Sequence, residues 1–282
     1  DEGIERLLFV DPQDENTAPQ TYVLFDGVRA QASGIQYAKA NEVPVKLGLI
    51  DSLFDQLNNS NWFDSHKPEY AIGEAKTELP ADSFTSKGDG AYETGELAKL
   101  TEEGRHEVDF TYTGASLASE SGKPAALVST ASGVVVIDRT APKLAGASIK
   151  GGYEPDSEVA QMPGQDGQSS FGVLFGGERT LSLQLVDVPS KEGIEASGVV
   201  EFEITVVCHD DLDASDKGKK EIYTQDSLKI SDDGVVEVPL KNEGTYLLSE
   251  LKVTVDDRAG NKSDPISIDA FFGTSGFDRV SV

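Results

Sequence analysis

The stretch Val134-Val135-Val136-Ile137-Asp138-Arg139-Thr140-Ala141-Pro142 lies at the middle of the 282-residue chain and decides how the chain is organised. Four β-branched residues in a row predict the end of a buried strand, and the X-Pro step after the charged pair favours an extended start to a new segment. Thr17-Ala18-Pro19 and Phe277-Asp278-Arg279 repeat parts of this pattern near the two ends. We therefore predict that residues 137–142 join two copies of one unit.

Similar residues also recur 140 positions apart. The pairs are Leu100 and Leu240, Glu103-Gly104 and Glu243-Gly244, His106 and Tyr246, Val108 and Leu248, Gly133 and Gly273, Ile137 and Phe277, and Asp138-Arg139 and Asp278-Arg279. Upstream the spacing drifts, which is typical of loop insertions in a shared fold. The sequence thus predicts a first domain at 1–139 and a second at 140–282. Residues 1–12 fit the tail of a preceding repeat as well as the start of the first domain.

Composition restricts the class of protein. Fifty acidic residues against 24 basic ones give a formal charge of -26, which disfavours nucleic acid and anionic membrane as partners. The chain contains no run of about 18 apolar residues, so no membrane-spanning helix is predicted. The start, Asp1-Glu2-Gly3, has no basic-then-apolar leader, so we expect targeting signals to lie outside this piece. A single cysteine, Cys208, excludes an internal disulfide.

Short alternating segments indicate an all-β fold. Val43–Ile50, Glu107–Thr113, Thr180–Val186 and Val199–Val207 alternate apolar and polar residues, and turn residues separate them. One short helix is expected near 52–60, with Ser52 as its N-cap. We therefore predict two tandem β-sandwiches. The inward residues should include Val108, Phe110, Val136, Leu183, Phe202, Ile204, Tyr246 and Val253.

Two motifs carry a family resemblance. Ala196-Ser197-Gly198-Val199 precedes a strand, and Gly244-Thr245-Tyr246 leads towards Val253-Thr254-Val255-Asp256-Asp257-Arg258-Ala259-Gly260-Asn261-Lys262-Ser263. These residues resemble the tandem bacterial immunoglobulin-like (Big-type) repeats of cell-surface proteins, which pass into the next copy through Asp-x-Thr-x-Pro, as Asp138–Pro142 does. In the long turn, Asp256, Asn261 and Gly260 are expected to build a corner. The first copy departs from the motif, having Tyr112-Thr113-Gly114-Ala115-Ser116 there.

Candidate chemistry is sparse. Cys208-His209-Asp210 places a nucleophile beside a base, but neighbouring strand residues point to opposite faces, so we expect an unreactive, partly buried thiol. Ser249-x-x-Lys252 has an acylase spacing but falls in a predicted strand. His106 is expected to have a structural role. No catalytic site is predicted, and the chain is not expected to be an enzyme.

The acidic loop at 210–216 is either a metal site or an ordinary solvated turn. Asp210, Asp211, Asp213 and Asp216 place four carboxylates in one loop, and Ca²⁺ prefers such oxygen ligands. The EF-hand spacing fails, and Lys217, Lys219 and Lys220 partly neutralise the charge, so a solvated turn is favoured and no cofactor is required. A Lys143–Asn261 isopeptide bond, a crosslink of some related repeats, has no support in the spacing.

Two classes of function remain. The resemblance, the acidic surface and the lack of further cysteines favour a non-catalytic stalk, spacer or adhesive module of an extracellular, cell-surface protein of a Gram-positive bacterium. Its partners would be neighbouring repeats and a host or cell-wall ligand, with an anchor outside this piece. The alternative is an accessory, carbohydrate-binding or spacer domain beside an extracellular glycosidase. Trp62, Phe63 and Tyr70 are the candidate aromatic platform for a sugar, and a satellite core explains the same cluster.

Overall fold

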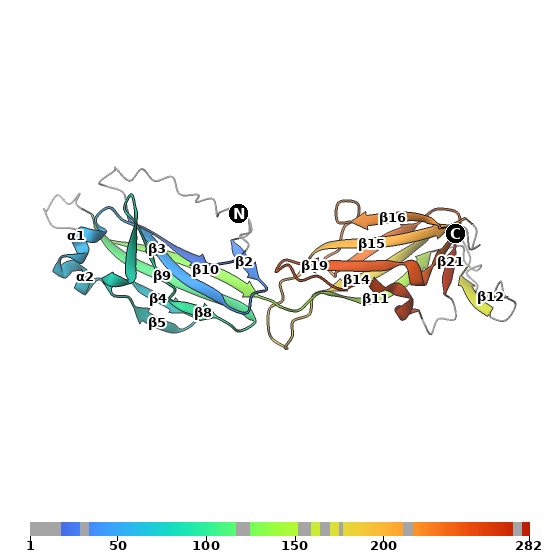
Figure 1. The fold of residues 1–282 in the computed structure, drawn as a ribbon, viewed down its shortest axis with the longest axis horizontal. Helices are drawn as coiled ribbons and strands as arrows, with labels where there is room; N and C mark the ends of the chain where they lie inside the picture. Colours follow the sequence, from blue (N-terminus) through green and yellow to red (C-terminus); the bar gives the residue numbers. More distant parts are fainter. Residues whose placement is uncertain are drawn as a thin grey trace. The chain divides into compact units, whose positions relative to one another are not determined.

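The computed structural model describes residues 18–28, 34–116, 125–151, 159–163, 170–174, 177–210, 217–272 and 278–282. The chain forms two compact units, each drawn with its own sheets in Figure 1. The first unit comprises Asp1–Arg139 together with Lys191–Glu195, and the second comprises Thr140–Ser190 together with Ala196–Val282. Among the described residues no helix is long and apolar enough to cross a membrane.

The first unit is a sandwich of two five-stranded sheets. One sheet has the order β1-β3-β7-β6, with β8 also paired to β3, and the other has the order β2-β10-β9-β4-β5. Strands β2 and β10 run parallel, whereas the other neighbours run antiparallel. The strands are β1 (Gln20–Phe25), β2 (Ile35–Ala38), β3 (Val43–Ile50), β4 (Glu69–Ile72), β5 (Ala75–Glu78), β6 (Phe84–Gly88), β7 (Ala91–Thr94), β8 (Ala98–Leu100), β9 (Gly104–Ser116) and β10 (Ala125–Ile137).

The second unit repeats this plan with more interruptions. A three-stranded sheet has the order β11-β14-β17, and an eight-stranded sheet has the order β12-β13-β21-β18-β15-β19-β20, with β16 also paired to β15. Strands β13 and β21 run parallel. The strands are β11 (Lys143–Gly151), β12 (Val159–Pro163), β13 (Ser170–Leu174), β14 (Arg179–Val186), β15 (Val199–His209), β16 (Lys219–Thr224), β17 (Val235–Leu240), β18 (Thr245–Leu247), β19 (Lys252–Asp257), β20 (Ile266–Ser267) and β21 (Arg279–Ser281).

The strand order defines the fold class. With strands lettered in chain order, the sheets of the first unit read A-B-E-D and A′-G-F-C-C′, with a parallel A′–G pair. The second unit reads A-B-E and A′-G-F-C-C′, where the F strand is split into β18 and β19 and the G strand into β20 and β21. This is the topology of immunoglobulin-like sandwiches. The predicted all-β class is therefore confirmed.

Each unit has its own core, built from the inward residues of its alternating strands. All eight predicted core residues are buried, with at most 4% of their surface exposed. Val108 and Phe110 belong to the core cluster of the first unit, and the five second-unit residues belong to that of the second. Val136 is buried but lies outside both clusters, because its neighbours Val135 and Ile137 are the residues of β10 that join the core, so its predicted place in the core is wrong. Burial of one face of each strand is what a sandwich requires.

Val200 does not follow the alternation of its strand. The alternation over Val199–Val207 predicts that Val200, Phe202, Ile204 and Val206 share the inward face, but 43% of the surface of Val200 is exposed. The cause is a β-bulge in β15, because Val199 pairs with Asp257 and Glu201 with Asp256, which leaves Val200 as the extra residue. A bulge of this kind leaves one residue unpaired and re-aims its side chain.

The predicted single helix is two short helices, α1 (Phe54–Asn58) and α2 (Asn61–Ser65). Ser52 does not cap α1. Instead Asp51, buried at the end of β3, accepts a hydrogen bond from the backbone N–H of Leu53 at 2.8 Å. Ser60 begins α2 by accepting a hydrogen bond from the N–H of Trp62 at 3.2 Å. A Ser or Asp oxygen satisfies the donors that a helix start leaves open.

Three further strand predictions need correction. The turn residues of 64–96, such as Gly88-Asp89-Gly90, predict a loop-rich segment, but it contains β4, β5, β6 and β7. β5 and most of β6 are exposed on both faces, so these strands show no alternation from which they could be predicted. The apolar ends of Leu228–Ile230 predict a short strand, but only Ile230 pairs, in an isolated bridge with Val236. The apolar residues of 245–255 and 266–272 predict two long strands, which the 3₁₀ helices η2 (Leu248–Glu250) and η3 (Ile268–Phe271) interrupt. A third 3₁₀ helix, η1 (Ala81–Ser83), precedes β6.

The repeat at 140 residues is structural at the start of strand F. Gly104 and Gly244 both adopt a positive φ, of 114° and 142°. Two residues later, Tyr246 Oη accepts a hydrogen bond from the N–H of Asn242 at 3.1 Å, and His106 Nε2 donates one to the carbonyl of Glu102 at 2.7 Å. Each side chain thus bonds the backbone four residues upstream and closes the same corner of its unit.

The spacing changes in strand G. Val135 pairs with His106 and Val280 pairs with Tyr246, so the equivalent positions lie 145 residues apart. The match of Asp138-Arg139 with Asp278-Arg279 therefore does not join equivalent positions of strand G, and Phe277 lies outside the described residues. Asp138-Arg139 follows its strand G, whereas Arg279 begins β21.

Alkaline pH should weaken the first unit through Tyr112. Its hydroxyl donates to Asp51 Oδ2 at 2.7 Å, and burial, followed by the Asp51 charge, raises its pKa well above the usual value. Burial and Asp55 raise the pKa of Tyr92 to about 12. A tyrosine whose folded pKa is raised keeps its proton while the unfolded chain loses one near pH 10. The free energy of unfolding should therefore fall as pH rises above about 10.

Urea unfolding followed by tryptophan fluorescence at several pH values from neutral to strongly alkaline tests this expectation. Tyr112→Phe should be less stable at neutral pH, because Asp51 loses a buried donor, and its stability should fall less steeply above pH 10. The same slope in the variant and the parent would show that Tyr112 does not carry the effect.

Candidate functional site

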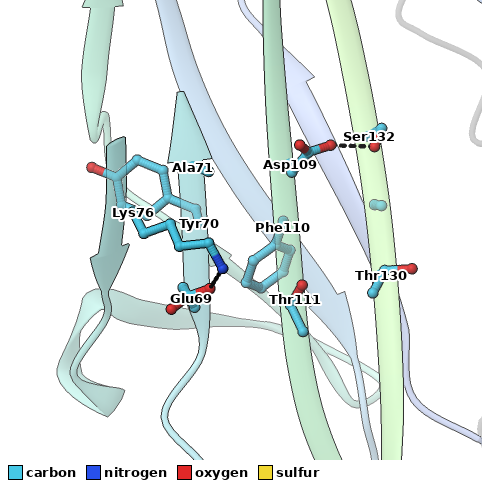
Figure 2. A pocket seen from close by; sticks show the side chains of 10 residues that line it. Glu69, Tyr70, Ala71, Lys76, Asp109, Phe110, Thr111, Thr130 and Ser132 are labelled. Carbon is cyan, nitrogen blue, oxygen red and sulfur yellow. Dashed lines mark hydrogen bonds and ion pairs between the residues drawn. The ribbon is translucent and has the colours of Figure 1, made fainter. Parts of the chain in front are cut away.

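One hollow among the described residues lies on the outer face of the A′-G-F-C-C′ sheet of the first unit. It has a volume of about 330 Å³ and crosses β4, β5, β9 and β10 (Figure 2). Its lining residues are Glu69, Tyr70, Ala71, Lys76, Asp109, Phe110, Thr111, Thr130, Ala131 and Ser132. We call it the outer-face hollow.

Strand register arranges the outward side chains in two rows. In one row Thr130 of β10, Thr111 of β9 and Glu69 of β4 are direct partners across the strands. In the other row Ser132, Asp109, Ala71 and Lys76 are partners in the same way. Strands lie about 4.8 Å apart and alternate residues on one strand about 6.8 Å apart, so the rows form a grid of polar groups.

The hollow exists because Ala71 is small. It lies between Lys76 and Asp109, and its methyl group leaves the space that a longer side chain would fill. Lys76 crosses this gap and binds Glu69 Oε1 at 2.8 Å, as Figure 2 shows. On the other side the Ser132 hydroxyl donates to Asp109 Oδ1. The result is a small floor bounded by hydroxyls, carboxylates and one ammonium group.

The charges in the hollow are partly compensated. The hydrogen bond and charge of Glu69 raise the pKa of Lys76, so the ammonium form is retained. This pair is exposed, so it contributes little to stability. Asp109 is exposed and shares one oxygen with Ser132. The hollow therefore offers hydrogen-bond acceptors in excess and no uncompensated positive charge.

The three aromatic residues predicted as a sugar platform have different surroundings. Phe63 is buried in the main core of the first unit and contacts Phe54, with ring centroids 5.6 Å apart. Tyr70 packs against the edge of the same core and lines the outer-face hollow. Trp62 packs against a separate small cluster of Leu53, Leu57 and Ala115. A ligand role for these three residues stays a prediction.

Trp62 has a contact that the sequence did not indicate. The ring of His66 stacks on its indole at 4.2 Å with an interplanar angle of 11°, and His66 Nδ1 donates to the Trp62 carbonyl. The indole Nε1 is buried and has no hydrogen-bond partner among the described residues. The cluster of Leu53, Leu57 and Ala115 with Trp62 is a satellite core of the kind that the sequence suggested as an explanation for this tryptophan.

The predicted calcium loop is largely outside the described residues. Asp210 is exposed at the end of β15, and Asp211, Asp213 and Asp216 belong to the part that the structure does not describe. The prediction of a metal there stays a prediction. In the second unit, carboxylate oxygens of Asp187 and Asp257 lie within 4.8 Å of each other. Because Ca²⁺ takes six to eight oxygen ligands, this pair alone does not define a metal centre.

The pair Asp187 and Asp257 has a structural use. Asp187 Oδ2 accepts from the N–H of Gly198 at 2.6 Å and from the Ser197 hydroxyl at 3.2 Å. Asp257 accepts from the N–H and from Nδ2 of Asn261, both at 2.8 Å. The sequence predicted that Asp256 would bond this turn, but Asp257 does so, and Asp256 forms an ion pair with Lys262 at 3.3 Å. Gly260 adopts the expected positive φ, of 86°.

Cys208 is more deeply buried than predicted, with 3% of its surface exposed. Its sulfur lies 3.6 Å from the carbonyl of Glu243, and burial raises the pKa of the thiol. The side chain of His209 is also buried and binds Glu250 Oε2 at 2.6 Å. The two side chains make separate contacts, which favours the predicted unreactive thiol.

The outer-face hollow could not be found from the sequence. Its signal is the outward alternation Glu69/Ala71, Asp109/Thr111 and Thr130/Ser132. The first pair lies in the segment interpreted as loop, so the register that joins the three pairs was not accessible.

Strand order and pairing place both units in the class of immunoglobulin-like sandwiches. Solved structures similar to the chain include a chimeric titin Z1Z2-Z1Z2 tandem carrying a GRGDS peptide from fibronectin, with 13% identity, 86% of this chain and 94% of that chain covered, and a TM-score of 0.19. Another is titin domains A168–A170, with 9% identity, coverage of 89% and 99%, and a TM-score of 0.19. No family model and no curated protein matches the chain.

Proposed function

We propose that the chain is a non-catalytic tandem module of a bacterial cell-surface protein, which serves as a stalk or spacer and presents an adhesive face. The observation that carries the proposal is the repetition of one sandwich, in which a positive-φ glycine at the start of strand F is followed two residues later by a side chain, His106 or Tyr246, that bonds the backbone four residues upstream. Repetition of a unit with its own core is how a chain gains length without new chemistry.

The parallel A′–G pair suits a unit that carries tension. In the first unit β2 is the strand nearer the N-terminus and β10 leads out of the unit, and their residues pair over Ile35–Ala38 and Val134–Ile137. A pull on the two ends of the chain would move the strands past each other along their length. Their hydrogen bonds would then be loaded together rather than one after another.

Arg139 strengthens the point where the chain leaves the first unit. Its guanidinium donates to the carbonyls of Ala40 at 3.0 Å, Asn41 at 2.9 Å and Thr101 at 2.8 Å. Its backbone N–H donates to Glu103 Oε1 at 3.1 Å. Five fixed N–H donors let an arginine bind several carbonyls at once, which a lysine ammonium does less well.

Stretching the full chain by its two ends tests the proposal. We expect two separate unfolding steps, each of which lengthens the chain by on the order of 400–500 Å, at roughly 3.3–3.6 Å per residue. Arg139→Ala should lower the unfolding force of one step and leave the other unchanged.

Arg105→Ala is the matched control, since it also removes one arginine from the first unit, but its side chain binds the carboxylates of Glu107 and Glu195 at exposed positions and no backbone carbonyl is among these contacts. Extension without force-resisting steps would contradict a load-bearing role. An equal effect of both variants would assign the change to charge rather than to the carbonyl contacts.

A further inference from the structure

The adhesive part of the proposed function needs a face and a ligand class. We propose that the outer-face hollow of the first unit binds one unit of a neutral, hydroxyl-rich saccharide. This inference rests on the proposed function and names its binding site. The sequence suggested a sugar platform around Trp62, whereas this site lies on the outer face of the sheet, and Trp62 is not part of its lining.

The donors and acceptors of the hollow match sugar hydroxyls. Asp109 keeps acceptor capacity beyond its bond to Ser132, and a carboxylate has about four lone-pair positions. Thr111 and Thr130 are direct partners across the strands, and the hydroxyl of each can both donate and accept. Lys76 adds an ammonium donor beside Glu69. A ligand with several adjacent hydroxyls can satisfy these groups together.

The same residues disfavour other small ligands. A phosphate, sulfate or acidic sugar would meet two carboxylates and one ammonium group that Glu69 already neutralises. A lipid would need an apolar wall, and the outward rows contain only Ala71 as an apolar side chain. A simple cation would compete with Lys76 for Glu69. A neutral polyol carries none of these costs.

The volume of the outer-face hollow also fits a small saccharide. A volume of about 330 Å³ is near the lower end for small-molecule sites, which suits a single sugar ring. The corresponding sheet of the second unit has a hollow of about 160 Å³ that Glu201, Glu203 and Asp256 line together with Lys262. It has half the volume and more carboxylates, so the first unit is the better site.

Two substitutions address the hollow without disturbing the fold. Ala71→Ile fills the floor, and a β-branched residue is well tolerated on a half-exposed strand. Asp109→Asn removes the charge and keeps an oxygen for Ser132. The matched controls are Ala75→Ile on β5, outside the lining, and Glu107→Gln, two residues from Asp109 on β9.

Saturation-transfer NMR of the full chain with lactose, cellotriose, maltotriose and chitotriose is the test. Sialyllactose and spermidine are further probes in the same experiment, and binding of calcium chloride is measured by titration calorimetry. We expect at least one neutral probe to bind, about tenfold more weakly after Asp109→Asn and undetectably after Ala71→Ile. Both controls and Trp62→Ala should bind as the parent does. Urea unfolding of each variant checks that it is folded.

The proposal is overturned if no neutral saccharide binds, if only a charged probe binds, or if Trp62→Ala removes binding while Ala71→Ile does not. None of these results bears on the stretching experiment. Two unfolding steps that are sensitive to Arg139 would keep the stalk role while the saccharide site is abandoned.

Discussion

Replacing Phe54 by alanine should lower the free energy of unfolding of the first unit by about 4 kcal/mol. Phe54 is 2% exposed, and its ring lies 4.4 Å from that of Tyr92, 5.5 Å from Phe84 and 5.6 Å from Phe63. Truncation leaves a cavity between α1 and both sheets that these rigid rings cannot close. It also removes edge-to-face contacts among the rings.

Equilibrium urea unfolding followed by tryptophan fluorescence measures this change. Val128→Ala is the control in the same unit, because Val128 is 66% exposed and its truncation should change stability by less than about 0.5 kcal/mol. A loss below about 1 kcal/mol for Phe54→Ala would show that the aromatic cluster is not part of a packed core.

Gly244→Ala should destabilise the second unit by about 3 kcal/mol. Gly244 has a φ of 142°, and an added Cβ would lie 2.5 Å from the carbonyl oxygen of His209 and 2.7 Å from Cys208 Sγ. Both the backbone strain and the contact with a neighbouring strand oppose a side chain here. The corner that Tyr246 closes would have to open.

Gly260→Ala separates the cost of backbone strain from the cost of the close contact. Gly260 also has a positive φ, of 86°, but an added Cβ would meet nothing within 4 Å. It should therefore cost only about 1 kcal/mol, the strain alone. Circular dichroism of urea unfolding gives both values. Equal losses for the two variants would mean that the close approach at Gly244 contributes nothing.

The sequence was sufficient for the fold class because the deciding residues are inward and regular. Phe110 and Ile204 lie in strands whose alternation is complete, and both are fully buried. The sequence also predicted that His106 and Tyr246 occupy equivalent positions in the two units. Each follows its glycine by two residues, which is the spacing that the corner at the start of strand F requires.

The sequence failed where partners distant in the chain decide the structure. Ser52 does not cap α1, and the neighbouring Asp51 instead accepts from the N–H of Leu53 with one oxygen and from Tyr112, 61 residues away, with the other. Val200 turns outward because of a bulge that is defined by its pairing with β19. The outer-face hollow needs the register of four strands, and short exposed strands such as β5 carry no pattern from which that register could be predicted.

The central claim is that two sandwiches with separate cores make up the chain, and its single tryptophan and single cysteine allow a direct test. Trp62 belongs to the first unit and Cys208 to the core of the second. In one urea titration, Trp62 fluorescence and the reaction of Cys208 with a thiol reagent should each report one unit. We predict that Phe54→Ala shifts only the fluorescence transition and Gly244→Ala only the thiol transition. A common shift of both transitions in either variant would contradict two separate cores.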